Sequence, residues 1–359
     1  MPEMTKRERI VCALSREEPD RVPIYDLVDH VGIISRLAGE QLTLANAQVL
    51  IPRALGKVLD TTRVWLPEAL GRRVDSRGFV YERKDWFNEW MVDKPYHDRS
   101  GLIKYIKSDI DQLESWRPTH GAYTLDETRM WQKKFGETVI PASMAAEALT
   151  DVAILIGIDE FAYLDADEPQ LVKRWINAHH QRTMRSLQAE ADCRAISPVG
   201  WVFADCAFNH HLIFSKSFLT NHGFFQRLAE IMSTMHHFGL KIIFHSDGDI
   251  SAIIPELILA GADALAPIDV VAGLDLAELK QKYGDKVSFV GGIDIGLINS
   301  ATPDEIRNAT LRALKIAAPG GGFILGSSSE ELYENLPEEN ILAMWETTLE
   351  AGRYPISNL

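Results

Sequence analysis

The sequence predicts a single (β/α)8 barrel over residues 1–359, and three observations predict it. Short apolar segments alternate with helical ones, and eight such β-then-α units can be counted, which is the pattern of a parallel barrel. Polar residues repeatedly follow the apolar segments, at the positions where barrel enzymes carry their active sites. No low-complexity tract or long linker interrupts the series, so one continuous domain is expected. An open doubly wound sheet is the alternative topology.

An amphipathic helix opens the chain. Thr5 and Glu8 stand at the spacing of a capping box, an apolar stripe follows them, and Pro19 ends the helical segment before the first strand. The helical pattern is clearest over 170–190, 218–237, 250–260, 275–283 and 303–317. The eight predicted strands are 21–26, 58–66, 138–144, 194–205, 241–245, 262–268, 286–291 and 321–325.

Residues 72–97 depart from this alternation. Polar and apolar residues alternate on both sides of a Ser-Arg-Gly turn, which predicts an antiparallel β-hairpin inserted between barrel elements. The aromatic residues Trp86, Phe87 and Trp90 follow the turn. They form either a lid over an aromatic substrate or the small core of the insert itself.

The composition argues against several classes of protein. A net charge of −14 opposes nucleic-acid binding, because phosphate contacts need a basic face. No apolar run is long enough to span a membrane, and the N-terminus lacks the apolar core of a signal peptide. The three cysteines lie far apart without CxxC spacing, so we expect a cytoplasmic protein without a disulfide framework.

The ends of the predicted strands supply the candidate site residues. Because these ends meet at one mouth in a barrel, side chains far apart in sequence share one pocket. Asp26 and Asp205 are candidate general acids or substrate anchors, and the alternative is that each pairs with an arginine at the rim. Tyr25, His210 and Asp294 are candidate substrate-binding residues.

His245 and Asp247 are the most specific candidates. His245 ends a short buried strand, and residues at i and i+2 of an extended segment point the same way. The two side chains are therefore expected to face the same pocket. The alternatives are a buried histidine bonded to a neighbouring strand and an Asp-Gly turn.

Several segments in the second half of the chain are typical of one enzyme superfamily. They are Phe244-His-Ser-Asp-Gly-Asp249, Gly261-Ala-Asp-Ala-Leu-Ala-Pro-Ile268, Val290-Gly-Gly-Ile-Asp294, Gly320-Gly-Gly-Phe-Ile-Leu325 and Pro337-Glu-Glu-Asn-Ile341. This series resembles the uroporphyrinogen decarboxylase superfamily, and the resemblance covers most of the chain. It implies a (β/α)8 barrel with one of two chemistries. These are decarboxylation of a porphyrinogen and methyl transfer to or from a corrinoid cofactor, often with zinc.

The decarboxylase branch fits the chain poorly. That branch carries an arginine-rich motif after its first strand, where this chain reads Tyr25-Asp-Leu-Val-Asp-His30. Carboxylates in place of cations would repel an acidic porphyrinogen. The Gly-His-Gly element of the decarboxylase is also replaced, by Ser327-Ser-Ser-Glu-Glu331. We therefore do not expect uroporphyrinogen decarboxylase activity.

The corrinoid methyltransferase branch fits better, with one departure. It places metal ligands as His-x-Cys after the fifth strand and a further cysteine after the eighth. His245, Asp247 and Glu330 occupy the corresponding positions, so carboxylates replace both cysteines. This harder donor set suits zinc or another divalent ion. The missing thiolates put a thiol methyl acceptor in doubt.

The resemblance therefore implies a methyltransferase. It would move a methyl group from a small methylated donor, such as a methoxy-aromatic compound, to a corrinoid carried by a separate protein. The alternatives are a decarboxylase or lyase acting on a smaller acid, which arginines in the pocket would favour, and a binding barrel without chemistry. A homodimer is common in the superfamily that the chain resembles.

Overall fold

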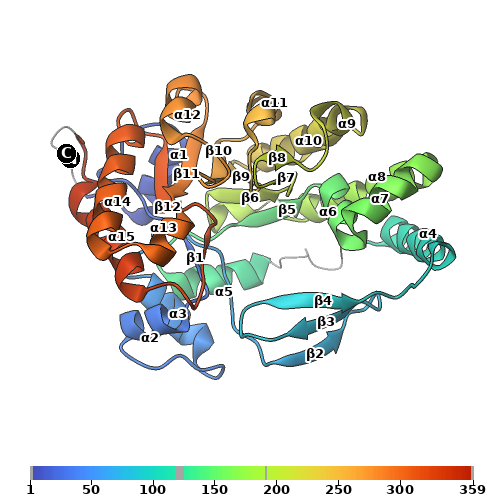
Figure 1. Ribbon diagram of the computed structural model, residues 1–359, viewed down its shortest axis with the longest axis horizontal. Coiled ribbons are helices and arrows are strands. Elements are labelled where there is room, and N and C mark those ends of the chain that lie inside the picture. Colours follow the sequence, from blue (N-terminus) through green and yellow to red (C-terminus); the bar gives the residue numbers. More distant parts are fainter. Residues whose placement is uncertain (1–2, 119–124, 191, 357–359) are drawn as a thin grey trace.

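A parallel β-sheet lies at the centre of the structure, a computed structural model that describes residues 3–118, 125–190 and 192–356 (Figure 1). Its six strands lie side by side in the order β12-β11-β10-β9-β6-β5, and every neighbouring pair is parallel. They are β5 (Ser143–Ala146), β6 (Val199–Phe203), β9 (Lys241–His245), β10 (Ala264–Ile268), β11 (Ser288–Ile293) and β12 (Phe323–Ser327).

Two short segments near the N-terminus close this sheet into a ring. The first is bridged to β12 through Ile24 and Leu325, and to the second through Tyr25 and Thr61. Thr61 is bridged in turn to Val139, which precedes β5 in the chain. The six strands and the two segments together make the eight strand positions, or staves, of a (β/α)8 barrel, so the predicted fold class is confirmed. Each predicted strand contributes to one stave.

Helix α1 (Lys6–Leu14) closes the bottom of the barrel. It begins at the predicted capping box, in which Thr5 and Glu8 satisfy each other's backbone N–H groups. Its residues Ile10 and Leu14 belong to the apolar cluster that fills the barrel, together with Trp201 of β6. The Ser288 hydroxyl, at the start of β11, donates to the carbonyl of Ala13 at 2.9 Å. With its amino end blocked, the barrel is open to ligands at the carboxyl ends of its strands.

Buried ion pairs fix α1 to the first two staves. Arg9 contacts Asp20 at 2.6 Å and Asp60 at 2.7 Å, and Arg21 contacts the other oxygen of Asp60 at 2.7 Å. The two carboxylates are therefore neutralised by arginines, as buried charges must be if they are not to cost several kcal/mol each.

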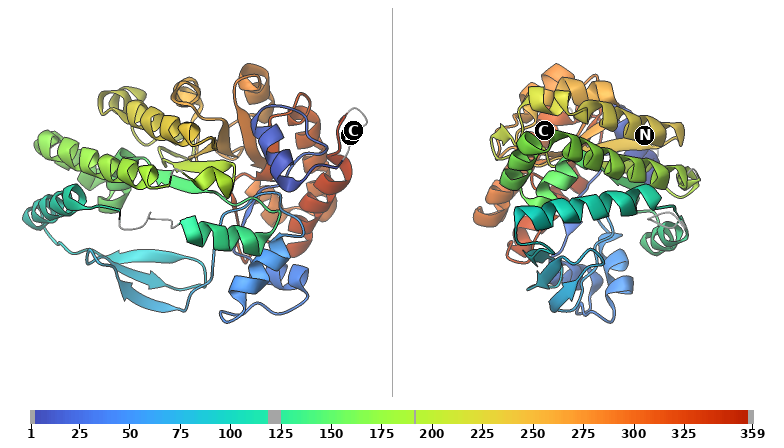
Figure 2. Two further views of the ribbon diagram at one scale, coloured as in Figure 1. Left: turned by 180° about the vertical axis from the view of Figure 1, so that it is seen from behind. Right: turned by 90° about the vertical axis from the view of Figure 1, so that its right-hand side faces the viewer.

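Helices surround the barrel, and their inner faces form a second, outer core (Figure 2). The expected helix over 218–237 is interrupted at Gly223, whose φ of 71° is left-handed, so two helices form there. No helix within the described ranges is long and apolar enough to cross a membrane. The helices after α1 are α2 (Val31–Ala38), α3 (Ala47–Leu55), α4 (Arg99–Ser115), α5 (Leu125–Phe135), α6 (Ala148–Ile156), α7 (Ile158–Asp167), α8 (Pro169–Gln188), α9 (Lys216–Asn221), α10 (Phe224–His237), α11 (Ile254–Ala260), α12 (Leu276–Tyr283), α13 (Ile295–Ser300), α14 (Pro303–Ala317) and α15 (Glu338–Ala351), with short 3-10 turns η1 (Cys193–Ala195) and η2 (Ser251–Ile253).

The insert is a three-stranded antiparallel sheet, one strand larger than the predicted hairpin. Its order is β2 (Gly71–Val74), β3 (Val80–Arg83) and β4 (Glu89–Asp93), and Figure 1 shows it beside the barrel. The third strand was not predicted, because the aromatic residues around it were interpreted as a cluster and not as a strand. Phe87 is buried in the outer core, whereas Trp90 is half exposed.

Two small sheets flank the open end of the barrel. β1 (Leu27–Val28) continues the first stave and pairs in parallel with β13 (Glu331–Leu332), so an early and a late segment of the chain meet at the mouth. β7 (Ala207–Phe208) and β8 (His211–Leu212) form a short hairpin after β6.

Candidate active site

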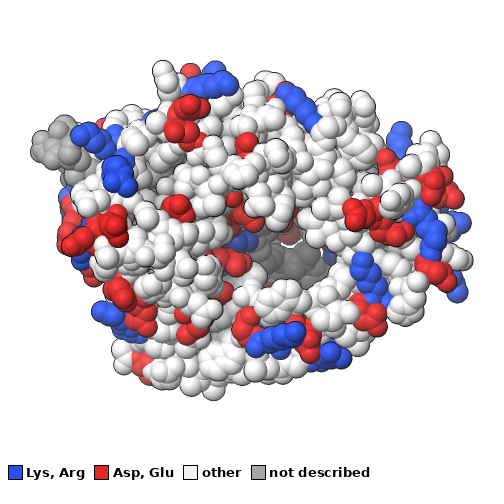
Figure 3. All heavy atoms as spheres, in the orientation of Figure 1, with Lys and Arg blue, Asp and Glu red and all other residues white. Residues whose placement is uncertain are grey.

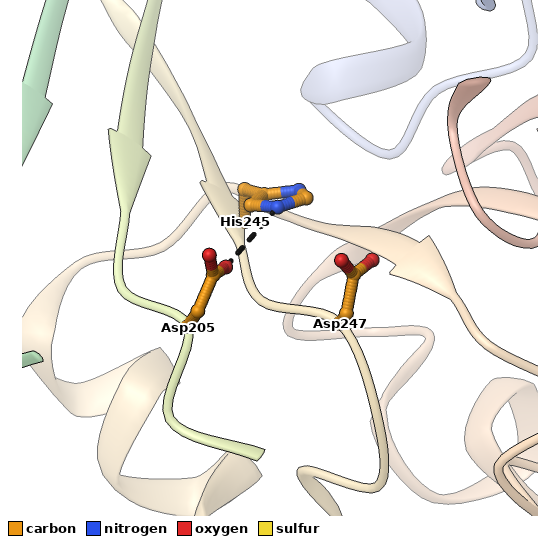
Figure 4. Close-up of side chains that lie close together, drawn as sticks. All are labelled: Asp205, His245 and Asp247. Atoms are coloured by element: carbon orange, nitrogen blue, oxygen red, sulfur yellow. Dashed lines mark ion pairs between the residues drawn. The ribbon is translucent and has the colours of Figure 1, made fainter. Parts of the chain in front are cut away.

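The strand period of two brings His245 and two aspartates together at the open end of the barrel. The side chains of Ile243 and Trp201 point into the barrel. By the same period, His245 at the end of β9 and Asp205, two residues beyond β6, also face inward. Asp247 follows His245 by two residues. Figure 4 shows both carboxylates directed toward the imidazole from separate loops.

His245 lies between two carboxylates. Its Nε2 is 3.3 Å from Oδ1 of Asp205, and its Nδ1 is 3.1 Å from Oε1 of Glu330. The second contact is an ion pair without hydrogen-bond geometry, since neither Nδ1 nor Oε1 has a hydrogen-bond partner. Asp205, His245 and Asp247 each offer one ligand atom within 4.8 Å of the others.

Arg63 holds Glu330 in place, and no sequence pattern predicts this role. Its NH2 donates to Oε2 of Glu330 at 2.7 Å, and its Nε donates to the Tyr25 hydroxyl at 3.2 Å. The guanidinium also lies over the rings of Trp201 and Phe203, at 5.4 and 5.1 Å. Arg63 lies within the weakest predicted strand, 58–66, and no motif surrounds it. Its position beside Glu330 follows only from the closure of the barrel.

These contacts shift the protonation equilibria of the cluster. Burial opposes the charged form of His245, but Glu330 and the contact with Asp205 outweigh it and raise the pKa of His245 to about 10. Burial likewise opposes ionisation of Glu330, yet His245 and Arg63 hold its pKa below the ordinary value. Burial raises the pKa of Asp247 to about 6, against the attraction of His245. At neutral pH His245 is therefore an imidazolium paired with Glu330.

The donor set fits a divalent metal ion, with one change from the predicted ligands. Asp205 joins His245 and Asp247 within ligand distance, and Glu330 does not, because its oxygens face Arg63 and Nδ1 of the imidazole. One imidazole nitrogen and two carboxylates suit zinc or a harder divalent ion. A carboxylate on the second imidazole nitrogen is the usual orienting partner of a metal-bound histidine. Nε2 can thus carry either a proton or a cation.

Asp26 lies outside this cluster. Its Oδ1 accepts from the backbone N–H of Ser327 and its Oδ2 from the indole of Trp345, each at 2.8 Å, and burial raises its pKa to about 7. Trp345 belongs to α15, on the outside of the barrel. Since Tyr25 faces inward, the strand period turns Asp26 outward, and this geometry gives it a structural contact instead of the predicted catalytic one.

Loop backbones hold the other two predicted substrate-binding residues. Nδ1 of His210 lies 2.7 Å from the carbonyl oxygen of Ala272. Asp294 caps α13, and its Oδ1 accepts from Gly296 and Leu297. Tyr25, by contrast, is buried inside the barrel against Trp201, and burial raises the pKa of its phenol well above the ordinary value.

Comparisons with known proteins agree with this architecture. The family model described as uroporphyrinogen decarboxylase (URO-D) matches residues 92–351. Among solved structures, a methyltransferase from Methanosarcina mazei is similar with a TM-score of 0.67 and 16% sequence identity, over 97% of this chain and 99% of that chain. At that identity the likeness shows a shared fold. No curated protein matches the chain.

Proposed function

We propose, since this chain belongs to the uroporphyrinogen decarboxylase family, that it moves a methyl group from a small methylated donor to a corrinoid on a separate protein. The observation that supports this most is the group formed by Asp205, His245 and Asp247 at the open end of the barrel. The similarity to a solved methyltransferase also favours methyl transfer over decarboxylation.

In this proposal Nε2 of His245 and the carboxylates of Asp205 and Asp247 would hold a divalent cation, and Glu330 fixes the imidazole from the other side. When bound, the cation would supply Lewis acidity for the atom that loses its methyl group. Phe203, whose ring lies 5.4 Å from that of His245, keeps one side of the site apolar.

The transfer itself breaks one bond and forms one bond. The methyl–oxygen bond of a methoxy donor breaks, and its electron pair stays on oxygen. Cobalt(I) of the corrinoid gives a pair to the methyl carbon and becomes formally cobalt(III). Stabilising the charge that develops on oxygen is the contribution that preorganised groups make to such a step.

Two measurements test the proposal. Elemental analysis of the purified protein is expected to find about one equivalent of a divalent metal, which His245→Ala loses. Formation of methylcobalamin from cob(I)alamin and a panel of methyl donors is expected to fall by roughly 100-fold or more in that variant. Asp304→Asn, an exposed aspartate on α14, is the matched control. Absence of methyl transfer from every donor would contradict the proposal.

The position of Arg63 favours a second candidate function, a decarboxylase or lyase reaction on a small acid. An arginine in the wall of the site can bind a substrate carboxylate. Its charge is already paired with Glu330, which weakens the case. Release of carbon dioxide from small carboxylic acids, abolished in Arg63→Met, would favour this candidate over methyl transfer.

A further inference from the structure

One buried carboxylate near the mouth has no cation beside it. Asp29 follows β1 and is 5% exposed. Val28 packs in the outer core, so the strand period turns Asp29 toward the interior of the mouth. Its Oδ2 accepts from the side-chain amide of Asn88 at 3.3 Å, while its Oδ1 is buried without any hydrogen-bond partner among the described residues.

Several other buried carboxylates of this chain are paired with an arginine, and Asp26 has a neutral N–H donor on each oxygen. Each of the following meets an arginine: Asp20 and Asp60 at the barrel bottom, Glu147 through Arg227, and Glu330 through Arg63. No lysine or arginine in the described part of the chain forms an ion pair with Asp29. An unpaired buried oxygen is costly in either protonation state, because the carboxylate lacks a donor and the carboxyl proton of Oδ1 would lack an acceptor.

The charges that act on Asp29 most strongly are themselves acidic. Glu331 belongs to β13, which pairs with β1, and Asp85 lies in the insert loop that also carries Asn88. Burial first, and then Glu331 and Asp85, raise the pKa of Asp29 to about 7. Figure 3 shows a hollow between the barrel and the insert sheet, with Asp and Glu atoms and a smaller number of Lys or Arg atoms on the side of the barrel. The surroundings thus favour a positive charge.

Asp29 lies within the length of a small molecule from His245. The N–H of Leu27 donates to the carbonyl of Glu330 at 2.9 Å, and the side chain of Glu330 contacts His245. Asp29 is two residues beyond Leu27, which is about 7 Å along an extended strand. A ligand that reaches from one site to the other needs roughly the length of a substituted aromatic ring.

We infer that the methyl donor carries a protonated amine at the end opposite its methyl group, and that Asp29 binds this ammonium. The inference rests on the proposed methyl transfer at His245 and names its substrate class, a methoxy-substituted aryl-alkylamine. An N–H of the ammonium satisfies Oδ1, and its charge offsets Asp29 and Glu331. A quaternary ammonium has no N–H and fits the unpaired oxygen less well.

Calorimetric titration of wild-type protein tests this directly, without turnover. The probes are para-methoxyphenethylamine and its alcohol analogue, in which a hydroxyl replaces the ammonium. We expect the amine to bind about tenfold tighter or more, the usual scale for a hydrogen bond to a charged group. Equal binding of the two probes, or no binding of the amine, overturns the inference.

Variants assign the preference to Asp29. Asp29→Asn is expected to bind amine and alcohol equally, and it should melt no lower than wild type because a buried unpaired charge is removed. Asp304→Asn keeps the wild-type preference. A preference for the amine that survives in Asp29→Asn overturns the assignment. The assay with cob(I)alamin tests the proposed function separately. Amine-selective binding without methyl transfer from either probe or from any donor of the panel contradicts the methyltransferase proposal and leaves the ammonium site standing.

Discussion

At the scale of single residues, His245 is the group on which the site depends. Both of its nitrogens face carboxylates, and Glu330 reaches it from a left-handed backbone conformation with φ of 62°. Such a conformation is uncommon outside glycine and costs of order 1 kcal/mol, so the surrounding contacts must hold it. Arg63 supplies the strongest of those contacts.

The protonated histidine predicts a pH dependence of stability in metal-free protein. The folded pKa of His245 is raised to about 10, above its ordinary value of about 6.5. Its pairing therefore stabilises the fold fully below pH 6.5, and this contribution is lost as the pH rises toward 10. Urea unfolding of chelator-treated protein should show a falling free energy over that window. His245→Asn should flatten the fall, and an unchanged slope in that variant would contradict the ion pairs.

Sequence reasoning located part of this residue pattern. His245 and Asp247 were predictable because they stand two residues apart at the end of one apolar strand and match the His-x-Cys position of the family that the chain resembles. The resemblance predicted Glu330 as the third ligand, whereas the structure places Asp205 beside His245 and Asp247. Asp205 and Glu330 arrive from different loops, whose geometry no local pattern sets. The role of Arg63 could not be predicted for the same reason. Asp26 was predicted to face the pocket, but the period of the first strand turns it outward, toward α15.

At the scale of elements, the loop after β9 depends on a close backbone approach. Gly248 has φ of 80°, and a Cβ there would lie 2.8 Å from the backbone nitrogen of Phe208 in β7. The loop therefore packs directly on the β7–β8 hairpin, which follows Asp205. Only glycine meets both conditions without strain.

Gly248→Ala is expected to push these two loops apart and separate Asp247 from Asp205. Affinity for zinc, measured by competition with a chromogenic chelator, should fall by about tenfold or more, the scale of a disturbed metal site. Gly320→Ala is the control, since its φ of 78° is equally left-handed but nothing lies within 4 Å of a Cβ there. Equal affinities in the two variants would show that the loop contact does not set the ligand geometry.

The elements themselves were the most predictable level. The capping box placed α1 correctly, and the apolar runs marked all eight staves, because caps and burial leave local signatures. Two features were not predicted, the third strand of the insert and the helix break at Gly223. A single glycine inside a helical pattern does not by itself predict where the helix ends.

At the scale of the whole molecule, closure of the barrel depends on contact between the first and last staves. Gly326 of β12 packs against this seam, and a Cβ there would lie well inside contact distance of the Tyr25 carbonyl. Gly326→Ala should therefore lower the free energy of unfolding by about 1–3 kcal/mol or more, the range for overpacking. Chemical denaturation against Gly320→Ala measures the difference, and a loss no larger than that of the control would mean that the seam yields easily.

The same seam has a consequence for how the protein is made. The backbone N–H of Ser327 donates a hydrogen bond to Asp26, 301 residues earlier in the chain. Likewise, β1 can pair only after β13 has been synthesised. During translation the first stave and its buried carboxylate emerge early and have no partner until almost the whole sequence has left the ribosome. Such long-range pairing is slow and leaves apolar edges open to aggregation. Stalling synthesis before residue 323 should yield a nascent chain that chaperones retain.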